Sequence, residues 1–201
     1  VIDGNISSSS LTSLSAVAVL GGSGTLGATT IAGTHSPGNS PGLQTFAGDL
    51  TYQDGSTLVW ELVADTIAGR GSNFDAINLT GSANLAFTGT TTVNLAFASA
   101  GSTVDWSDTL WDNDITGTNG WRVFDLGSGS VSGLANLSIG GGPWLDGAGN
   151  SLASLRPQAA FLLVQDGNDV YLNYGVSAIP EPAGALATGL LLGSATLLRR
   201  R

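Results

Sequence analysis

Short strand-like runs that end at glycine constrain the fold of this chain more than any other feature. In each run, small or polar residues alternate with apolar ones, and a Gly or Asp-Gly ends a run about every eight residues. The runs are LQTFAG (43–48), DLTYQDG (49–55), STLVWEL (56–62), INLTG (77–81), ANLAFTG (83–89) and TTVNLAFA (91–98). A period of two with many Thr, Val, Leu and aromatic residues indicates β-strands. We therefore predict an all-β fold.

The recurrence of one strand-and-turn unit favours a parallel β-helix, or solenoid. Each coil of a solenoid needs its neighbours to bury an apolar face, so the unit repeats along the chain. A β-sandwich produces a similar pattern and remains the alternative. We expect very little helix before residue 179. The segment from Gly147 to Pro157 is the exception, and Arg156-Pro157 would end it.

Composition divides the chain into four parts. Residues 1–33 are a Ser/Gly-rich lead-in, which we interpret as the first coils of an array whose beginning is missing. Within them, the apolar stretch 14–20 predicts a buried strand. Residues 34–104 carry the solenoid repeats, residues 105–178 form an aromatic-rich capping region, and residues 179–201 are a tail.

The capping region contains four of the five tryptophans. It has strand-like runs at 121–126, 131–139, 159–165 and 170–176. The last two flank Asp166-Gly167-Asn168-Asp169, which predicts a hairpin turn.

Charge excludes nucleic acid as a partner. The chain has no Lys, and the tail holds three of the six Arg but only one of the fifteen acidic residues. The rest of the chain therefore has three Arg against fourteen acids, a net charge of −11. Nucleic-acid binding needs clustered Lys or Arg to displace counterions from phosphates, and this part of the chain has no such cluster.

The sequence predicts no catalytic centre, cofactor or metal site. There is no Cys, and the single His35 precedes a Pro-Gly turn, where we expect a solvated loop side chain. Parallel β-helices can carry lyases or glycosidases, so a polysaccharide-active enzyme that uses a pair such as Asp105 and Asp108 remains an alternative. A calcium-stabilised adhesion module is another. The run 112–117 resembles the start of a calcium loop, but Val123 occupies the twelfth position, where Glu is needed.

Two passages resemble known families. The first is Gly33-Thr34-His35-Ser36, followed by the turn motif of Pro37, Gly38, Asn39, Ser40, Pro41 and Gly42, and then by Asp49-Leu50 and Gly55-Ser56-Thr57-Leu58. This passage is similar to the passenger-associated repeat of autotransporter-like proteins. The resemblance implies a right-handed parallel β-helix and no catalytic residue.

The second passage is the tail, which resembles the PEP-CTERM sorting signal in three successive parts. They are the motif Pro180, Glu181 and Pro182, the apolar segment 183–198, and the terminal cluster Arg199, Arg200 and Arg201. The resemblance implies that an exosortase-type membrane protease recognises the tail and cuts near Pro-Glu-Pro during export from a bacterial cell.

The apolar segment predicts a single transmembrane helix. Sixteen residues rise about 24 Å as a helix, short of a hydrocarbon core of about 30 Å, and snorkelling Arg side chains can cover the difference. The terminal Arg cluster favours the cytoplasmic side and leaves residues 1–178 outside. We therefore expect a precursor in the inner membrane and then a product at the cell surface or outside the cell.

These observations predict an exported structural or adhesive protein of the cell surface or extracellular matrix. Its other partners would be an exopolysaccharide or neighbouring surface proteins. Rows of polar side chains such as Thr90-Thr91-Thr92 would form the outward binding surface.

Overall fold

The computed structural model describes residues 1–176, and the tail with its sorting motif and Arg cluster lies outside them. The described chain consists mostly of short strands in three sheets, whose order we give as sheets A, B and C. Nearly all the strand pairs are parallel, and the two antiparallel pairs involve the last two strands. The prediction of a strand-rich fold is therefore confirmed.

Sheet A has seven strands, in the order β1 (Asn5–Ile6), β4 (Thr25–Leu26), β7 (Leu43–Phe46), β10 (Ala76–Leu79), β13 (Trp121–Leu126), β17 (Asp169–Gly175) and β16 (Ala160–Asp166). Sheet B has the order β14 (Val131–Ser132), β11 (Leu85–Phe87), β8 (Leu50–Tyr52), β5 (Thr29–Ile31) and β2 (Thr12–Leu14). Sheet C has the order β15 (Leu137–Ile139), β12 (Thr91–Ala96), β9 (Ser56–Glu61), β6 (Thr34–Pro37) and β3 (Val19–Gly22).

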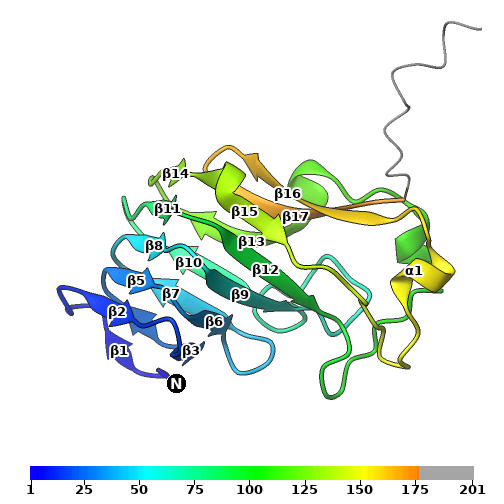
Figure 1. The fold of residues 1–201 in the computed structure, drawn as a ribbon, viewed down its shortest axis with the longest axis horizontal. Coiled ribbons are helices and arrows are strands. Elements are labelled where there is room, and N and C mark those ends of the chain that lie inside the picture. Colours follow the sequence, from blue (N-terminus) through cyan, green and yellow to red (C-terminus); the bar gives the residue numbers. More distant parts are fainter. Residues whose placement is uncertain (177–201) are drawn as a thin grey trace, which may run out of the picture.

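From β1 to β15, successive strands enter sheets A, B and C in rotation. Every third strand therefore pairs with the strand one coil earlier, which is the connectivity of a β-helix-like stack. Figure 1 shows the coils rising from β1, β2 and β3 in blue to the hairpin β16–β17 in orange. The long connections between coils gather on the side of the stack that carries α1 (Leu152–Leu155).

One column of side chains from each sheet fills the interior. The column of sheet A is Ile6, Leu26, Phe46, Leu79 and Leu126, that of sheet B is Leu14, Ile31, Tyr52 and Phe87, and that of sheet C is Leu20, His35, Leu58, Val93 and Ile139. Most of these side chains are fully buried. Burial of a large apolar side chain stabilises a fold by about 1.5–3 kcal/mol, so the columns hold the coils together.

The residues next to these columns point outward and are rich in hydroxyl groups. The outward row of sheet B is Ser13, Thr30, Thr51, Ala86 and Ser132, and that of sheet C is Val19, Thr34, Thr57, Thr92 and Ser138. The expectation that Thr90, Thr91 and Thr92 form one outward row is wrong. Thr91 is buried, and its Oγ1 lies 2.9 Å from Oγ of Ser56, because adjacent strand residues face opposite sides.

The long connections also stack on one another. The backbone N–H of Thr103 donates to the carbonyl of Val63, and that of Gly147 donates to the carbonyl of Val104. Between these connections lies an aromatic cluster that includes Trp106, Trp111, Trp121 and Phe161. The 3₁₀ helices η1 (Thr109–Asp112), η2 (Gly117–Asn119) and η3 (Leu134–Asn136) lie in the same part of the sequence.

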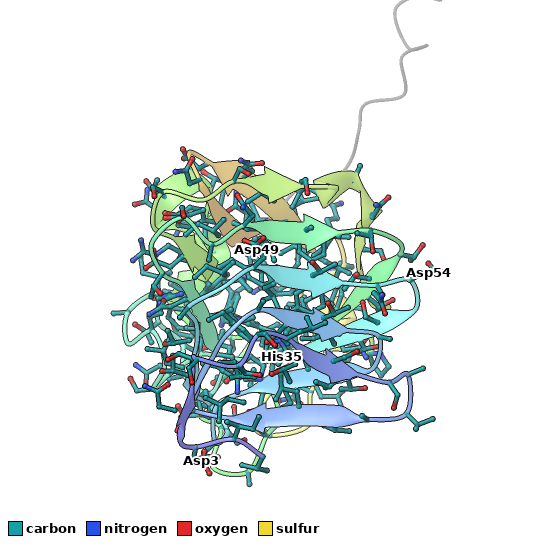
Figure 2. The ribbon with its side chains drawn as sticks, turned by 90° about the vertical axis from the view of Figure 1, so that its left-hand side faces the viewer. Asp3, His35, Asp49 and Asp54 are labelled. Atoms are coloured by element: carbon teal, nitrogen blue, oxygen red, sulfur yellow. The ribbon has the colours of Figure 1, made fainter. Side chains whose placement is uncertain are left out.

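Carboxylates join consecutive coils at the turns. Oδ1 of Asp3 accepts the N–H of Ser23 at 3.0 Å, Oδ1 of Asp49 accepts that of Asn84 at 2.8 Å, and Oδ1 of Asp54 accepts that of Thr90 at 2.9 Å. Figure 2 shows Asp3 and Asp54 at the edge of the stack. Such bonds satisfy turn N–H groups that no strand pairs. The scattered acids of this chain therefore have a structural role at each turn.

Two predicted strands are wrong in detail. The stretch 14–20 is divided between β2 and β3 by a turn in which Val17 is 94% exposed. The run 131–139 is divided between β14 and β15, because Gly133 has φ +70 and ends the first strand. In both places the run spans a corner between two sheets. The expected short helix and the hairpin are confirmed as α1 and β16–β17.

Candidate functional site

The turn motif joins coils two and three through contact between two glycines. Pro37 is the last residue of β6, and residues 38–42 lead to β7. Gly38 has φ +77, and a Cβ atom there would lie 2.1 Å from Cα of Gly42. The N–H of Gly42 donates to Oδ1 of Asp75 at 2.7 Å. The two Pro-Gly pairs therefore allow the backbone to pass itself within contact distance.

Replacing Gly38 with Ala should destabilise the fold by about 3 kcal/mol, from strain at positive φ and from overpacking. Gly55→Ala is the matched control, because Gly55 has φ +78 but nothing lies within 4 Å of its added Cβ atom. It should cost only about 1 kcal/mol. Urea unfolding followed by tryptophan fluorescence measures both losses. Equal losses would show that the contact between Gly38 and Gly42 is unimportant.

His35 is not a solvated loop residue, as its place beside the turn suggested. It lies in β6 with no exposed surface, because the strand continues through Pro37 and this side chain faces inward. Its Nδ1 lies 2.6 Å from Oη of Tyr52, and its Nε2 lies 2.6 Å from Oε1 of Gln44. Figure 2 shows His35 among the strands. Burial lowers its pKa to about 4, although the bond to Gln44 opposes the change, so the ring is neutral at pH 7.

A hollow of about 360 Å³ lies on the outer side of sheet A. Arg122 of β13 and Tyr171 of β17 are neighbours across the antiparallel pair and line it. The remaining lining comes from two connections, through residues that include Arg70 and Phe74 from the first and Thr118 from η2. Two of the three arginines of the described chain therefore line one hollow.

Ion pairs and hydrogen bonds fix both arginines. Arg122 lies 3.2 Å from a carboxylate oxygen of Asp125 and 3.2 Å from one of Asp169. Arg70 donates through Nε to the carbonyl of Arg122 at 3.0 Å, and it also donates to the side chain of Asn78. Asp169 in turn accepts the backbone N–H of Leu126 at 2.8 Å. This network fastens the first connection and the final hairpin to sheet A.

The electrostatic environments of the two arginines differ. Burial lowers the pKa of Arg70 to about 10, although the charge of Asp125 opposes this change. Partial burial also acts to lower the pKa of Arg122, but the hydrogen bond with Asp169 and the charge of Asp125 outweigh it and raise that pKa. Both guanidinium groups are therefore charged at pH 7 and balanced by two carboxylates.

The carboxylates considered from sequence for catalysis or calcium have separate local partners. Asp105 accepts from the N–H of Ser107, and Asp108 accepts from the N–H of Leu110. Asp112 pairs with Arg156 at 2.8 Å, whereas Asp114 accepts the N–H of Val176. Residues 1–176 contain no group of three or more His, Cys, Asp or Glu side chains placed to hold a metal ion.

The sorting motif Pro180, Glu181 and Pro182 and the cluster Arg199, Arg200 and Arg201 lie outside the described residues. Within residues 1–176, no helix has the length and hydropathy needed to span a bilayer. The hollow lined by Arg70 and Arg122 was missed from sequence. The only sequence signal was the scarcity of arginine, because these two residues lie in different coils.

Comparison with protein-family models, with curated proteins and with solved structures gave no match.

Proposed function

We propose that this chain is an exported, non-catalytic structural or adhesive protein of a bacterial cell surface or extracellular matrix. The observation that carries the proposal is the tail sequence, which combines Pro-Glu-Pro, an uncharged apolar segment and three terminal arginines. In the proposal, an exosortase-type membrane protease processes an inner-membrane precursor whose single transmembrane helix lies within residues 183–198.

The described part of the chain supports a scaffold role. It is a β-helix-like stack whose outward rows offer hydroxyl groups at the regular spacing of parallel strands, about 4.8 Å. Such rows suit weak, repeated contacts with a polysaccharide or a neighbouring surface protein. The carboxylates mostly accept N–H groups of turns, which gives them a structural use that requires no catalysis.

Glu181→Ala, or replacement of the three terminal arginines with alanine, should block processing and leave the full-length chain in the inner membrane. The reason is that either change removes a part of the signal without touching residues 1–176. Cell fractionation and intact mass of the surface-exposed protein measure the outcome in a bacterium that carries an exosortase. Asp166→Ala removes an exposed acid of the final hairpin and is the matched control. Normal surface delivery of both tail variants would refute the assignment.

A further inference from the structure

The hollow on sheet A is electrically balanced, although arginine is scarce elsewhere in the described chain. Arg122 has Asp125 and Asp169 within 3.2 Å, and Arg70 has Asp125 at 3.7 Å. Two positive charges therefore face two negative charges, within a body of net charge −11. An anionic ligand would gain little from arginines that carboxylates already neutralise, and the field of the whole body would repel it. The charge distribution favours a neutral ligand.

The hollow offers both donors and acceptors of hydrogen bonds. The side chain of Arg122 is 39% exposed, and among residues 1–176 its Nε has no acceptor. Thr118 is exposed on η2, and its hydroxyl can donate and accept, as can that of Tyr171. A ligand that carries hydroxyl groups can match such a mixed lining, because each hydroxyl is itself both a donor and an acceptor.

One end of the hollow contains a polar atom without a partner. Oδ1 of Asn173 is buried on β17 and accepts no hydrogen bond from the described residues. It lies beside Gly120, where an added Cβ atom would be only 2.3 Å from this oxygen. The backbone of Gly120 lines the hollow, so the missing side chain keeps this corner open. An unmet acceptor in a buried position costs free energy, which a ligand donor in this corner would recover.

Apolar groups complete the lining. Ile67 lies at the hollow with 44% of its surface exposed, and the buried ring of Phe74 also lines it. A combination of apolar surface with a few placed polar groups is typical of small-molecule sites, whose volumes start at roughly 300 Å³. The hollow, at about 360 Å³, is near the lower end of this range. It suits one or two sugar rings, which present C–H faces as well as hydroxyl groups.

We propose that the hollow between Arg122, Tyr171, Thr118 and Ile67 binds a neutral saccharide unit of a surface or matrix polysaccharide. The proposal deepens the adhesive role given above and rests on it for the source of the ligand. The donors of Arg122 and the hydroxyls of Tyr171 and Thr118 bind the sugar hydroxyls. Ile67 contacts a C–H face of the ring. A single site of this kind binds weakly, with a Kd of about 1 mM, and many copies on a surface provide avidity.

The test is binding of trisaccharides to the full 201-residue chain in mild detergent, by saturation-transfer NMR and calorimetry. The neutral probes are trimers of glucose, galactose, mannose and N-acetylglucosamine, and trigalacturonate is the charged counterpart of the galactose trimer. We expect at least one neutral probe to bind with a Kd below about 10 mM. Its Kd should be the same at low and high salt, and trigalacturonate should bind at least about tenfold more weakly. Failure of all four neutral probes would overturn the proposal.

Two variants locate the binding. Thr118→Trp fills the hollow without touching the ion pairs and should weaken binding of the neutral probe at least about tenfold. Thr90→Trp makes the same change at an exposed turn on the other side of sheet C and should leave the Kd unchanged. Arg122→Lys keeps the charge but loses the planar donor edge, and it should also weaken binding. Binding that survives Thr118→Trp would place the ligand elsewhere and refute the site.

The outcome is independent of the test of sorting. A chain that binds a neutral trisaccharide but is not processed at its tail would retain the site and lose the exosortase assignment. A chain that is processed normally but binds none of the probes would retain the proposed sorting and lose the saccharide site.

Discussion

Lowering the pH from 7 to 4 should destabilise the wild-type chain, relative to a His35→Gln variant, by about 3 kcal/mol. Burial lowers the folded-state pKa of His35 to about 4, whereas an unfolded His titrates near 6.5. Between these values the unfolded chain binds more protons than the folded chain. The contribution of His35 to stability is therefore present above pH 6.5 and is lost as the pH falls to 4.

The geometry gives the reason for this resistance to protonation. Because Nε2 faces the carbonyl oxygen of Gln44, it carries the ring proton, and Nδ1 accepts from the hydroxyl of Tyr52. A second proton would lie on Nδ1, in place of that accepted bond, and inside an apolar column between Leu20 and Leu58. Urea unfolding of both chains at several pH values measures the difference. A constant difference between pH 4 and 7 would show that His35 does not titrate as described.

The same trio allows a second check at fixed pH. His35→Leu should cost about 3 kcal/mol, because it leaves the hydroxyl of Tyr52 and the amide of Gln44 buried without their partner. Replacing all three residues together, by Leu, Phe and Leu, should recover most of this loss, since no buried polar group is then orphaned. No recovery would mean that the shape of the ring matters more than its hydrogen bonds.

Local pattern predicted many individual strands of the stack. STLVWEL became β9 and WRVFDL became β13, because alternation reports which side chains face the interior. The Asp-Gly-Asn-Asp sequence became the turn between β16 and β17, with Asp166 opposite Asp169. Where a run crossed a corner between two sheets, the pattern failed. Alternation continues across a short turn, so residues 131–139 looked like one strand although they are two.

Contacts between coils could not be predicted, because the coils have no fixed length. Phe46 pairs with Leu26, 20 positions earlier, whereas Leu126 pairs with Leu79, 47 positions earlier. The insertions that cause this change carry Arg70 and Thr118 to the hollow, and no spacing in the sequence marks them as neighbours. The interior position of His35 was missed for a related reason. The turn motif suggested that no strand reached it, but β6 ends at Pro37.

Raising the pH from 6.5 to 8.5 should destabilise the wild-type chain by about 2 kcal/mol relative to Asp75→Asn. Burial raises the pKa of Asp75 to about 8, and the charge of Glu61 adds to this rise, although the N–H groups of Gly42 and Glu61 oppose it. An unfolded Asp titrates near 3.8, so between 3.8 and 8 the folded chain binds more protons than the unfolded one. The contribution of Asp75 to stability is therefore lost as the pH rises through this range.

Asp75 also joins two coils, which separates its structural role from its titration. Its Oδ1 accepts the N–H of Gly42 at 2.7 Å, and its Oδ2 accepts that of Glu61 at 3.1 Å. Asp75→Ala should therefore cost about 3–4 kcal/mol at pH 6.5, because two backbone N–H groups lose their acceptor. Asp166→Asn, at an exposed position of the final hairpin, is the control for removing an acid without this burial. If Asp75→Asn and the wild-type chain lost stability in parallel between pH 6.5 and 8.5, Asp75 would not hold its proton in the fold. The link between the turn motif and the fourth coil would then depend on an ionised carboxylate, and its contribution to stability would not weaken above neutral pH.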